Sequence, residues 1–137
     1  MSSRGGKLAL FSAAVLLNMV ALVIASSTIY LSAEGADIRS AGAKRRRTAG
    51  LLAGVLGTLL ILWYAVQKRD PKAELYVAAA IGFASIGFSV AARIERNKGD
   101  DTHANIFASM AITIRIISLV TFVLSAGPVI YQLYFSK

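Results

Sequence analysis

The stretch that decides the fold is Ala104 to Phe135, ANIFASMAITIRIISLVTFVLSAGPVIYQLYF. It is the last of four long apolar segments, and roughly 18 or more apolar residues are enough to cross a hydrocarbon core about 30 Å thick. It also contains Arg115. A guanidinium is costly inside a bilayer, so we expect Arg115 to face a protein partner, a water-filled cavity or the headgroup level.

The length of this last segment leaves two positions for Arg115. A continuous helix over residues 104–135 would be about 48 Å long, so it either tilts and protrudes or breaks near Gly127 and Pro128. A crossing that ends at Ala126 places Arg115 near the midplane. A crossing that begins near Arg115 places it at an interface, where the side chain extends to water. We slightly favour the interfacial position.

Three further apolar segments precede it, at residues 8–33, 49–66 and 71–96. The chain has 137 residues, 56% of them hydrophobic, and a mean hydropathy of +0.63. The four segments use nearly all of it, so no soluble domain is left over. We predict an all-α integral membrane protein, a four-transmembrane-helix bundle with short loops that forms a single multi-pass domain over residues 1–137. The identity of the membrane does not follow from the sequence.

The first apolar segment also resembles a signal sequence, because Arg4 and Lys7 precede it and Val23-Ile24-Ala25 could pass as a cleavage site. The apolar run continues past Ala25, which favours a transmembrane helix. Asn18 lies near the middle of this segment. We expect it to make an interhelical hydrogen bond, and a specific alternative is a polar contact with Arg115.

Small residues recur at helical spacing in the two middle segments. In residues 49–66 they are Gly50, Gly54 and Gly57; in residues 71–96 they are Ala78, Gly82, Ser85 and Ser89. Such faces let neighbouring helices approach closely. A second stripe in residues 71–96, Ala80, Ala84, Gly87 and Ala91, suggests a helix packed on two sides. We predict that these two helices form an antiparallel hairpin, begun by Asp70 and Pro71, at the core of the bundle.

Aromatic and capping residues mark the ends of the predicted helices. Trp63 and Tyr64 are expected at the headgroup level, where amphipathic rings are favoured. Gly99 can end the third helix, and Asp101 or Thr102 can cap the fourth.

The net charge of +8 is concentrated in the predicted loops, most densely at Lys44, Arg45, Arg46 and Arg47 in the first loop. A basic cluster directly before an apolar segment most often anchors the topology. It can also contact anionic lipid headgroups or the phosphates of a nucleic acid. All three uses stay open from the sequence.

No catalytic constellation stands out. The seven acidic residues fall in predicted loops or at helix ends, and the chain has one histidine and no cysteine. A catalyst needs a nucleophile, base or metal set within mutual reach, so we expect no enzyme, no metal, no cofactor and no small-molecule substrate. His103 has no second ligand at metal spacing.

Two function classes remain. The first, which we favour, is a non-enzymatic structural or assembly subunit, with other subunits and membrane lipids as partners. Its setting would be the internal membrane of a virion beneath the capsid, or a respiratory or photosynthetic complex. The second is a small oligomeric channel or transporter that uses Arg115 as an anion site. In the first class, Arg115 is a polar tie to Asn18 or to a partner chain.

Overall fold

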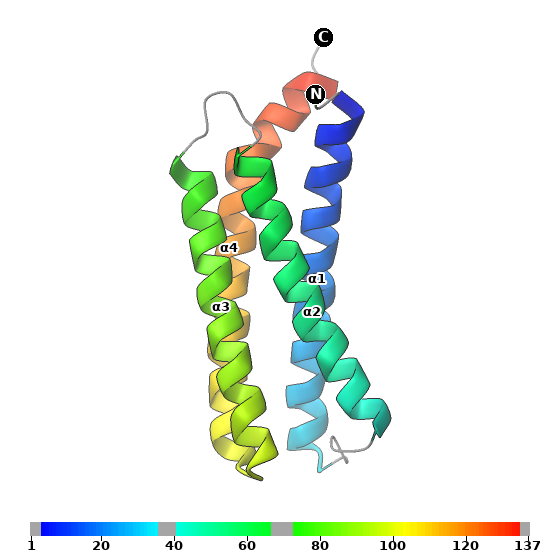
Figure 1. The fold of residues 1–137 in the computed structure, drawn as a ribbon, viewed down its shortest axis with the longest axis vertical. Helices are drawn as coiled ribbons and strands as arrows, with labels where there is room; N and C mark the ends of the chain where they lie inside the picture. Colours follow the sequence, from blue (N-terminus) through cyan, green and yellow to red (C-terminus); the bar gives the residue numbers. More distant parts are fainter. Residues whose placement is uncertain (1–3, 36–40, 67–72, 135–137) are drawn as a thin grey trace.

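The computed structural model describes residues 4–35, 41–66 and 73–134. In these ranges the chain forms α1 (Arg4–Ala33), α2 (Ala41–Val66), α3 (Ala73–Asn97) and α4 (Asp101–Tyr134). Figure 1 shows them as an elongated bundle of antiparallel neighbours, with both chain ends at the same end of the bundle. All four helices are long and apolar enough to cross a membrane. The predicted all-helical architecture is confirmed, and it is consistent with a multi-pass membrane protein.

The first turns of α2 differ from the prediction. The helix begins at Ala41 rather than near residue 49, so Lys44 to Arg47 lie within it and not in a loop. Lysine and arginine are good helix formers, and their charged ends reach water from a helix as readily as from a loop. The predicted start of α3 at Asp70 and Pro71 lies outside the described residues.

The last helix does not break at Gly127 and Pro128. α4 continues through Pro128 to Tyr134, so the alternative of a break at this point is wrong and the continuous helix is the one found. Its final turns lean towards the start of α1 in Figure 1. Ile130, two residues beyond the proline, is buried in the apolar core, and this packing offsets the backbone hydrogen bond that a proline removes.

The connection from α3 to α4 is fixed by two caps. Gly99 has a positive φ of 87°, and the N–H groups of Gly99 and Asp100 donate to the carbonyls of Arg96 and Glu95. This is the Schellman arrangement, for which glycine is favoured. The N-cap of α4 is Asp100, whose Oδ1 accepts from the His103 N–H at 3.0 Å. The expected caps, Asp101 and Thr102, are therefore wrong by one or two positions.

The hydrogen bond from the His103 backbone lowers the pKa of the Asp100 carboxyl below its ordinary value of 3.8. Because the folded pKa is the lower one, the charged cap contributes stability above that ordinary value. The contribution is lost only as the pH falls through the lowered pKa. The cap is therefore complete at neutral pH.

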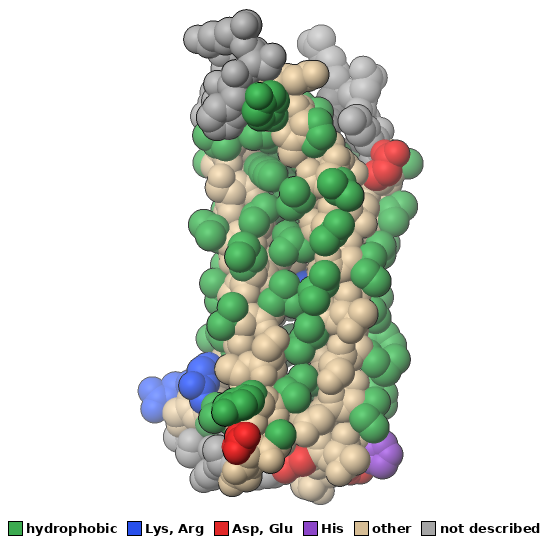
Figure 2. Space-filling view, turned by 180° about the vertical axis from the view of Figure 1, so that it is seen from behind, with side chains coloured by type: hydrophobic (Ala, Val, Ile, Leu, Met, Phe, Trp, Pro, Cys, Tyr) green, Lys and Arg blue, Asp and Glu red, His purple; other side chains and the backbone are tan. Residues whose placement is uncertain are grey.

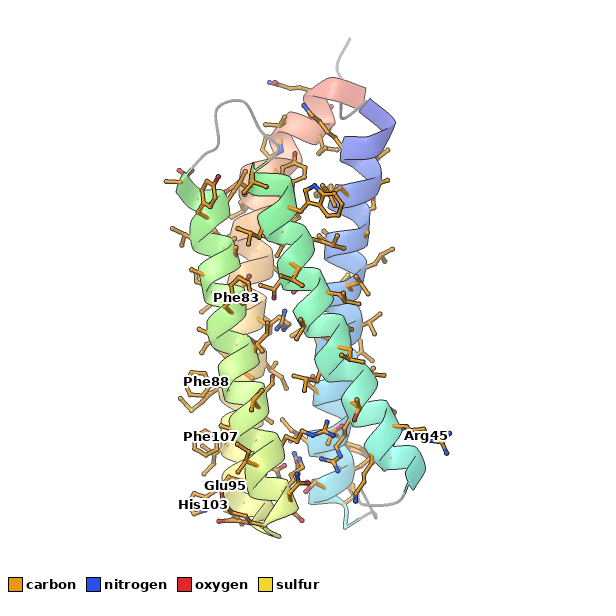
Figure 3. The ribbon with its side chains drawn as sticks, viewed as in Figure 1. Arg45, Phe83, Phe88, Glu95, His103 and Phe107 are labelled. Atoms are coloured by element: carbon orange, nitrogen blue, oxygen red, sulfur yellow. The ribbon has the colours of Figure 1, made fainter. Side chains whose placement is uncertain are left out.

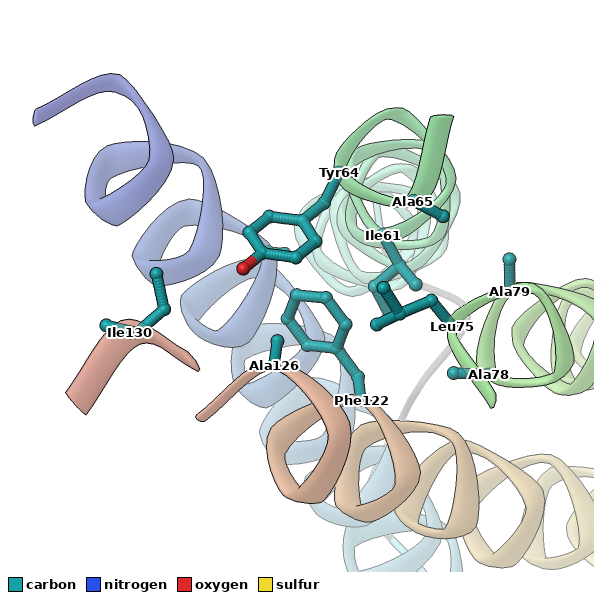
Figure 4. Close-up of a cluster of buried hydrophobic side chains, with 10 residues drawn as sticks. Ile61, Tyr64, Ala65, Leu75, Ala78, Ala79, Phe122, Ala126 and Ile130 are labelled. Atoms are coloured by element: carbon teal, nitrogen blue, oxygen red, sulfur yellow. The ribbon is translucent and has the colours of Figure 1, made fainter. Parts of the chain in front are cut away.

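An apolar core fills the end of the bundle where the chain begins and ends. Phe122 stacks on Phe11, with ring centroids 5.3 Å apart, and meets Tyr64 edge-on at 5.4 Å. Figure 4 shows Ile61, Leu75, Ala126 and Ile130 in the same cluster as the rings of Tyr64 and Phe122. Trp63 is exposed, whereas Tyr64 is buried and its ring completes the aromatic contact with Phe122. The expectation that both lie at the headgroup level stays a prediction.

The small-residue faces pack mostly on helices other than the predicted hairpin partner, although Gly82 of α3 lies against Thr58 of α2. The closest helix pairs are α3 with α4 and α1 with α2, while α2 and α3 touch less. Ser85 donates to the Ala111 carbonyl at 2.7 Å, and Ser118 donates to the Ala78 carbonyl at 2.6 Å. The second stripe of α3, at Ala80, Ala84 and Gly87, is exposed. Within the chain, α3 is therefore packed along one small-residue stripe and not two.

Candidate functional site

Arg115 lies between three helices near the middle of the bundle. Its Nη1 donates to Asn18 Oδ1 of α1 at 2.6 Å, and to the Gly54 carbonyl and Thr58 Oγ1 of α2 at 3.3 and 3.2 Å. Only 4% of the residue is exposed. The interfacial position favoured from the sequence is therefore wrong. The alternative contact with Asn18 is confirmed.

The acceptors of Arg115 are themselves held in place. Asn18 Nδ2 donates to the Ala14 carbonyl at 2.7 Å, which turns the amide oxygen towards the guanidinium. Thr58 donates to the Gly54 carbonyl at 2.9 Å, which leaves a lone pair of its hydroxyl for Arg115. Each acceptor is thus oriented by the helix that carries it.

The glycines of α2 provide the space for this polar group. A Cβ at Gly54 would lie 2.9 Å from Arg115 Nη2, and a Cβ at Gly57 would lie 2.6 Å from Asn18 Nδ2. Gly50, by contrast, receives Ile24 of α1. The glycine face of α2 was predicted as a packing face, and two of its three glycines accommodate the polar site.

The charge of Arg115 has no acidic partner in the described part of the chain. All its hydrogen-bond acceptors there are neutral oxygens, and the ion pairs found there involve other residues. A guanidinium has five N–H donors, whereas these three bonds use one nitrogen. A buried charge without a counter-charge is costly, so an anion would be stabilised at this position.

Arg115 also lines a partly open cavity of about 90 Å³, to which all four helices contribute residues. Four arginines line it: Arg47, Arg93, Arg96 and Arg115. The remaining described lining residues are apolar or hydroxyl-bearing, and none is acidic. Figure 2 shows a small area of Lys or Arg side chain at mid-height, between hydrophobic surfaces.

Two arginines at the outer part of the cavity are fixed by contacts between helices. Arg93 Nη1 donates to Thr48 Oγ1 of α2 at 3.0 Å. Arg96 Nη2 donates to Asn105 Oδ1 of α4 at 2.7 Å, and its Nη1 lies 3.8 Å from Asp101. Figure 3 shows nitrogen-bearing side chains between the helices at this end of the bundle. The cavity thus extends from Arg115 towards the end that carries the connection between α3 and α4.

The basic cluster of α2 divides between two environments. Arg47 lines the cavity and is half-buried, whereas Lys44, Arg45 and Arg46 are exposed. Figure 3 shows Arg45 directed away from the bundle. The cluster is therefore not one continuous surface.

Sequence reasoning did not single out Arg93 and Arg96. A signal for Arg96 was present, because Ser85, Ser89, Ala92 and Arg96 continue the small-residue stripe of α3 at helical spacing. Ser85, Ser89, Ala92 and Arg96 all line the cavity. Extending that stripe to the end of the helix would have predicted an arginine on the packed face.

The described residues contain no group of three histidine, cysteine or acidic side chains that could hold a metal ion. His103 is exposed and contacts Asp100. The chain matches no protein family model, no curated protein and no solved structure. Any proposal about function therefore depends on Arg115 and its cavity.

Proposed function

We propose that the protein is a multi-pass membrane protein that binds an anion in the cavity between its helices and carries it across the membrane. One observation carries the proposal: the described lining of the cavity holds four arginines and no acidic residue. Arg115, at the inner part, would be the principal binding charge. The site would lie within one chain, so binding would require no oligomer.

The distribution of polar residues favours a carrier over an open pore. On one side of Arg115 lies the cavity with its arginines. On the other side lies the apolar core around Phe122, Tyr64 and Ile61. An anion could reach Arg115 from the first side, and the second would have to open to release it. Access to a central site from one side at a time is how carriers work.

The structural-subunit function stays a prediction. It expected Arg115 to be a polar tie either to Asn18 or to a partner chain. The hydrogen bond between Arg115 and Asn18 lies within one chain, so no second chain is needed to hold the guanidinium. No feature of the described residues selects a virion, respiratory or photosynthetic setting.

Anion binding by purified protein tests the proposal. We would measure the binding of chloride, sulfate and inorganic phosphate by isothermal titration calorimetry, in nanodiscs of phosphatidylcholine alone. We expect at least one anion to bind, and Arg115→Leu to weaken it by about tenfold or more, because a charge-assisted contact is lost. Arg45→Leu is the matched control, since Arg45 is exposed.

Three outcomes would overturn the proposal. The first is that no anion binds to the wild-type protein, and the second is that Arg115→Leu binds as tightly as the wild type. The third is binding without uptake of the same anion into proteoliposomes, which would remove the carrier step. Circular dichroism of each variant checks that the bundle is intact.

A further inference from the structure

We infer that the anion is a dianionic tetrahedral oxyanion, a phosphate group above all, rather than a halide or a monocarboxylate. This inference rests on the proposed function and names the ligand of the same cavity. Three observations support it. The positively charged residues that line the cavity are all arginines, two of these arginines have neutral hydrogen-bond partners, and the cavity is small.

The lining cations are all arginines, although the chain also carries lysines. Arg47, Arg93, Arg96 and Arg115 line the cavity, whereas Lys44 and Lys98 are exposed and do not. A guanidinium presents parallel N–H donors that match two oxygens of one phosphate or carboxylate, while an ammonium acts as a point charge. Donors of this kind favour an anion with several equivalent oxygens over a spherical halide.

Two of these arginines have neutral hydrogen-bond partners. Arg93 donates to the Thr48 hydroxyl, and Arg115 donates to an amide, a hydroxyl and a carbonyl oxygen. No ion pair of either residue with an acidic group occurs in the described chain. Two positive charges bordering one cavity are matched by a dianion better than by a monoanion, because Coulomb attraction grows with the ligand charge.

The volume limits how much of a ligand the cavity can hold. The cavity measures about 90 Å³, whereas pockets for drug-sized molecules are about 300–1,000 Å³. A phosphate group fits this volume, whereas the rest of a larger phosphorylated molecule would extend outside the cavity. The hydroxyl of Ser89 also lines the cavity and adds a polar group beside the arginines. The same phosphate oxygens are presented by free inorganic phosphate and by the headgroup of phosphatidic acid.

The experiment compares anions of different charge and shape at one ionic strength. Wild-type protein in phosphatidylcholine nanodiscs is titrated with inorganic phosphate, sulfate, acetate and chloride at about pH 8. We expect phosphate and sulfate to bind about tenfold or more tightly than acetate and chloride. Arg115→Lys should weaken phosphate binding by about tenfold, because lysine keeps the charge but loses the paired donors. Arg45→Lys is the control and should not change it.

A second arm distinguishes the two sources of phosphate. The titration with inorganic phosphate is repeated in nanodiscs that contain phosphatidic acid, and native mass spectrometry counts the lipids retained by the protein. If phosphatidic acid is retained, and if it weakens phosphate binding to the wild type but not to Arg115→Lys, the site binds a lipid headgroup. Unchanged phosphate binding assigns it to the free ion. Both results support a phosphate ligand.

Acetate or chloride binding as tightly as phosphate would overturn this inference and leave the proposed function standing. So would an Arg115→Lys variant that keeps the full preference for phosphate over chloride. The absence of binding by every anion tested, in both kinds of nanodisc, would overturn the inference and the proposed function together.

Discussion

The guanidinium of Arg115 is held by neutral oxygens from α1 and α2, and none of them cancels its charge. A buried charge is stabilised by its hydrogen bonds as long as every partner is present. Removing one acceptor leaves the charged guanidinium with an unpaired donor. This loss destabilises the fold more than removing the guanidinium itself. The Asn18 amide makes the shortest of these bonds, at 2.6 Å. This asymmetry can be measured.

We therefore expect Asn18→Leu to destabilise the bundle by about 1–3 kcal/mol. We expect the double variant Asn18→Leu with Arg115→Leu to be more stable than Asn18→Leu alone, because no buried charge remains. Reversible unfolding in mixed micelles of sodium dodecyl sulfate measures all the variants. Equal stability of Asn18→Leu and the wild type would show that this hydrogen bond does not hold Arg115.

Part of this site could be predicted from single residues. The sequence showed that Arg115 needs a polar environment and that Asn18 is a possible partner. It could not show the roles of Thr58 and the Gly54 carbonyl, because their contribution depends on how α2 is rotated and how deep it sits against α4. The burial of Arg115 was also misjudged, since the length of the last apolar segment permits both an interfacial and a central position.

At the scale of the helices, glycine has a different role at each position. Gly54 and Gly57 of α2 lie against Arg115 and Asn18, so any Cβ would press on the polar site. Gly87 of α3 has nothing within 4 Å of a Cβ. Both Gly57 and Gly87 are inside helices, where glycine is about 0.5–1 kcal/mol less favourable than alanine. They therefore form a matched pair for the same substitution.

Gly57→Ala should destabilise the bundle by about 1–3 kcal/mol, because the new methyl would lie 2.6 Å from Asn18 Nδ2 and 3.2 Å from the Asn18 backbone nitrogen. Gly87→Ala should be neutral or stabilising by about 0.5–1 kcal/mol. The same unfolding measurement compares them. If both substitutions shift stability equally, the close approach of α2 to Asn18 does not matter for folding.

The sequence patterns predicted the four helices but not all of their ends. Four helices and their approximate ranges followed from four apolar segments, and Gly99 followed from its place after α3. The start of α2 could not be predicted in this way, because Lys44 to Arg47 are compatible with either a loop or a helix. A break of α4 near Pro128 was one of two alternatives, and the helix packing beyond it, at Ile130, was not visible in the sequence.

The whole molecule divides into an apolar half around Phe122 and a polar half around the cavity, with Arg115 between them. The small-residue stripes predicted close packing but not its partners. The two closest helix pairs, α1 with α2 and α3 with α4, meet at the seam where Arg115 of one pair is held by acceptors of the other. This seam is the part of the molecule that a carrier would have to rearrange.

The most direct test of the central claim is whether water reaches the cavity. The natural chain has no cysteine, so Ser89→Cys and Ser118→Cys each carry a single thiol. Ser89 lines the cavity, while Ser118 is fully buried between α3 and α4. In nanodiscs, an anionic, membrane-impermeant methanethiosulfonate should label Ser89→Cys at least about tenfold faster than Ser118→Cys. The arginines that line the cavity with Ser89 favour the reactive thiolate. Equal labelling rates, or no labelling of Ser89→Cys, would contradict a water-accessible site beside Arg115.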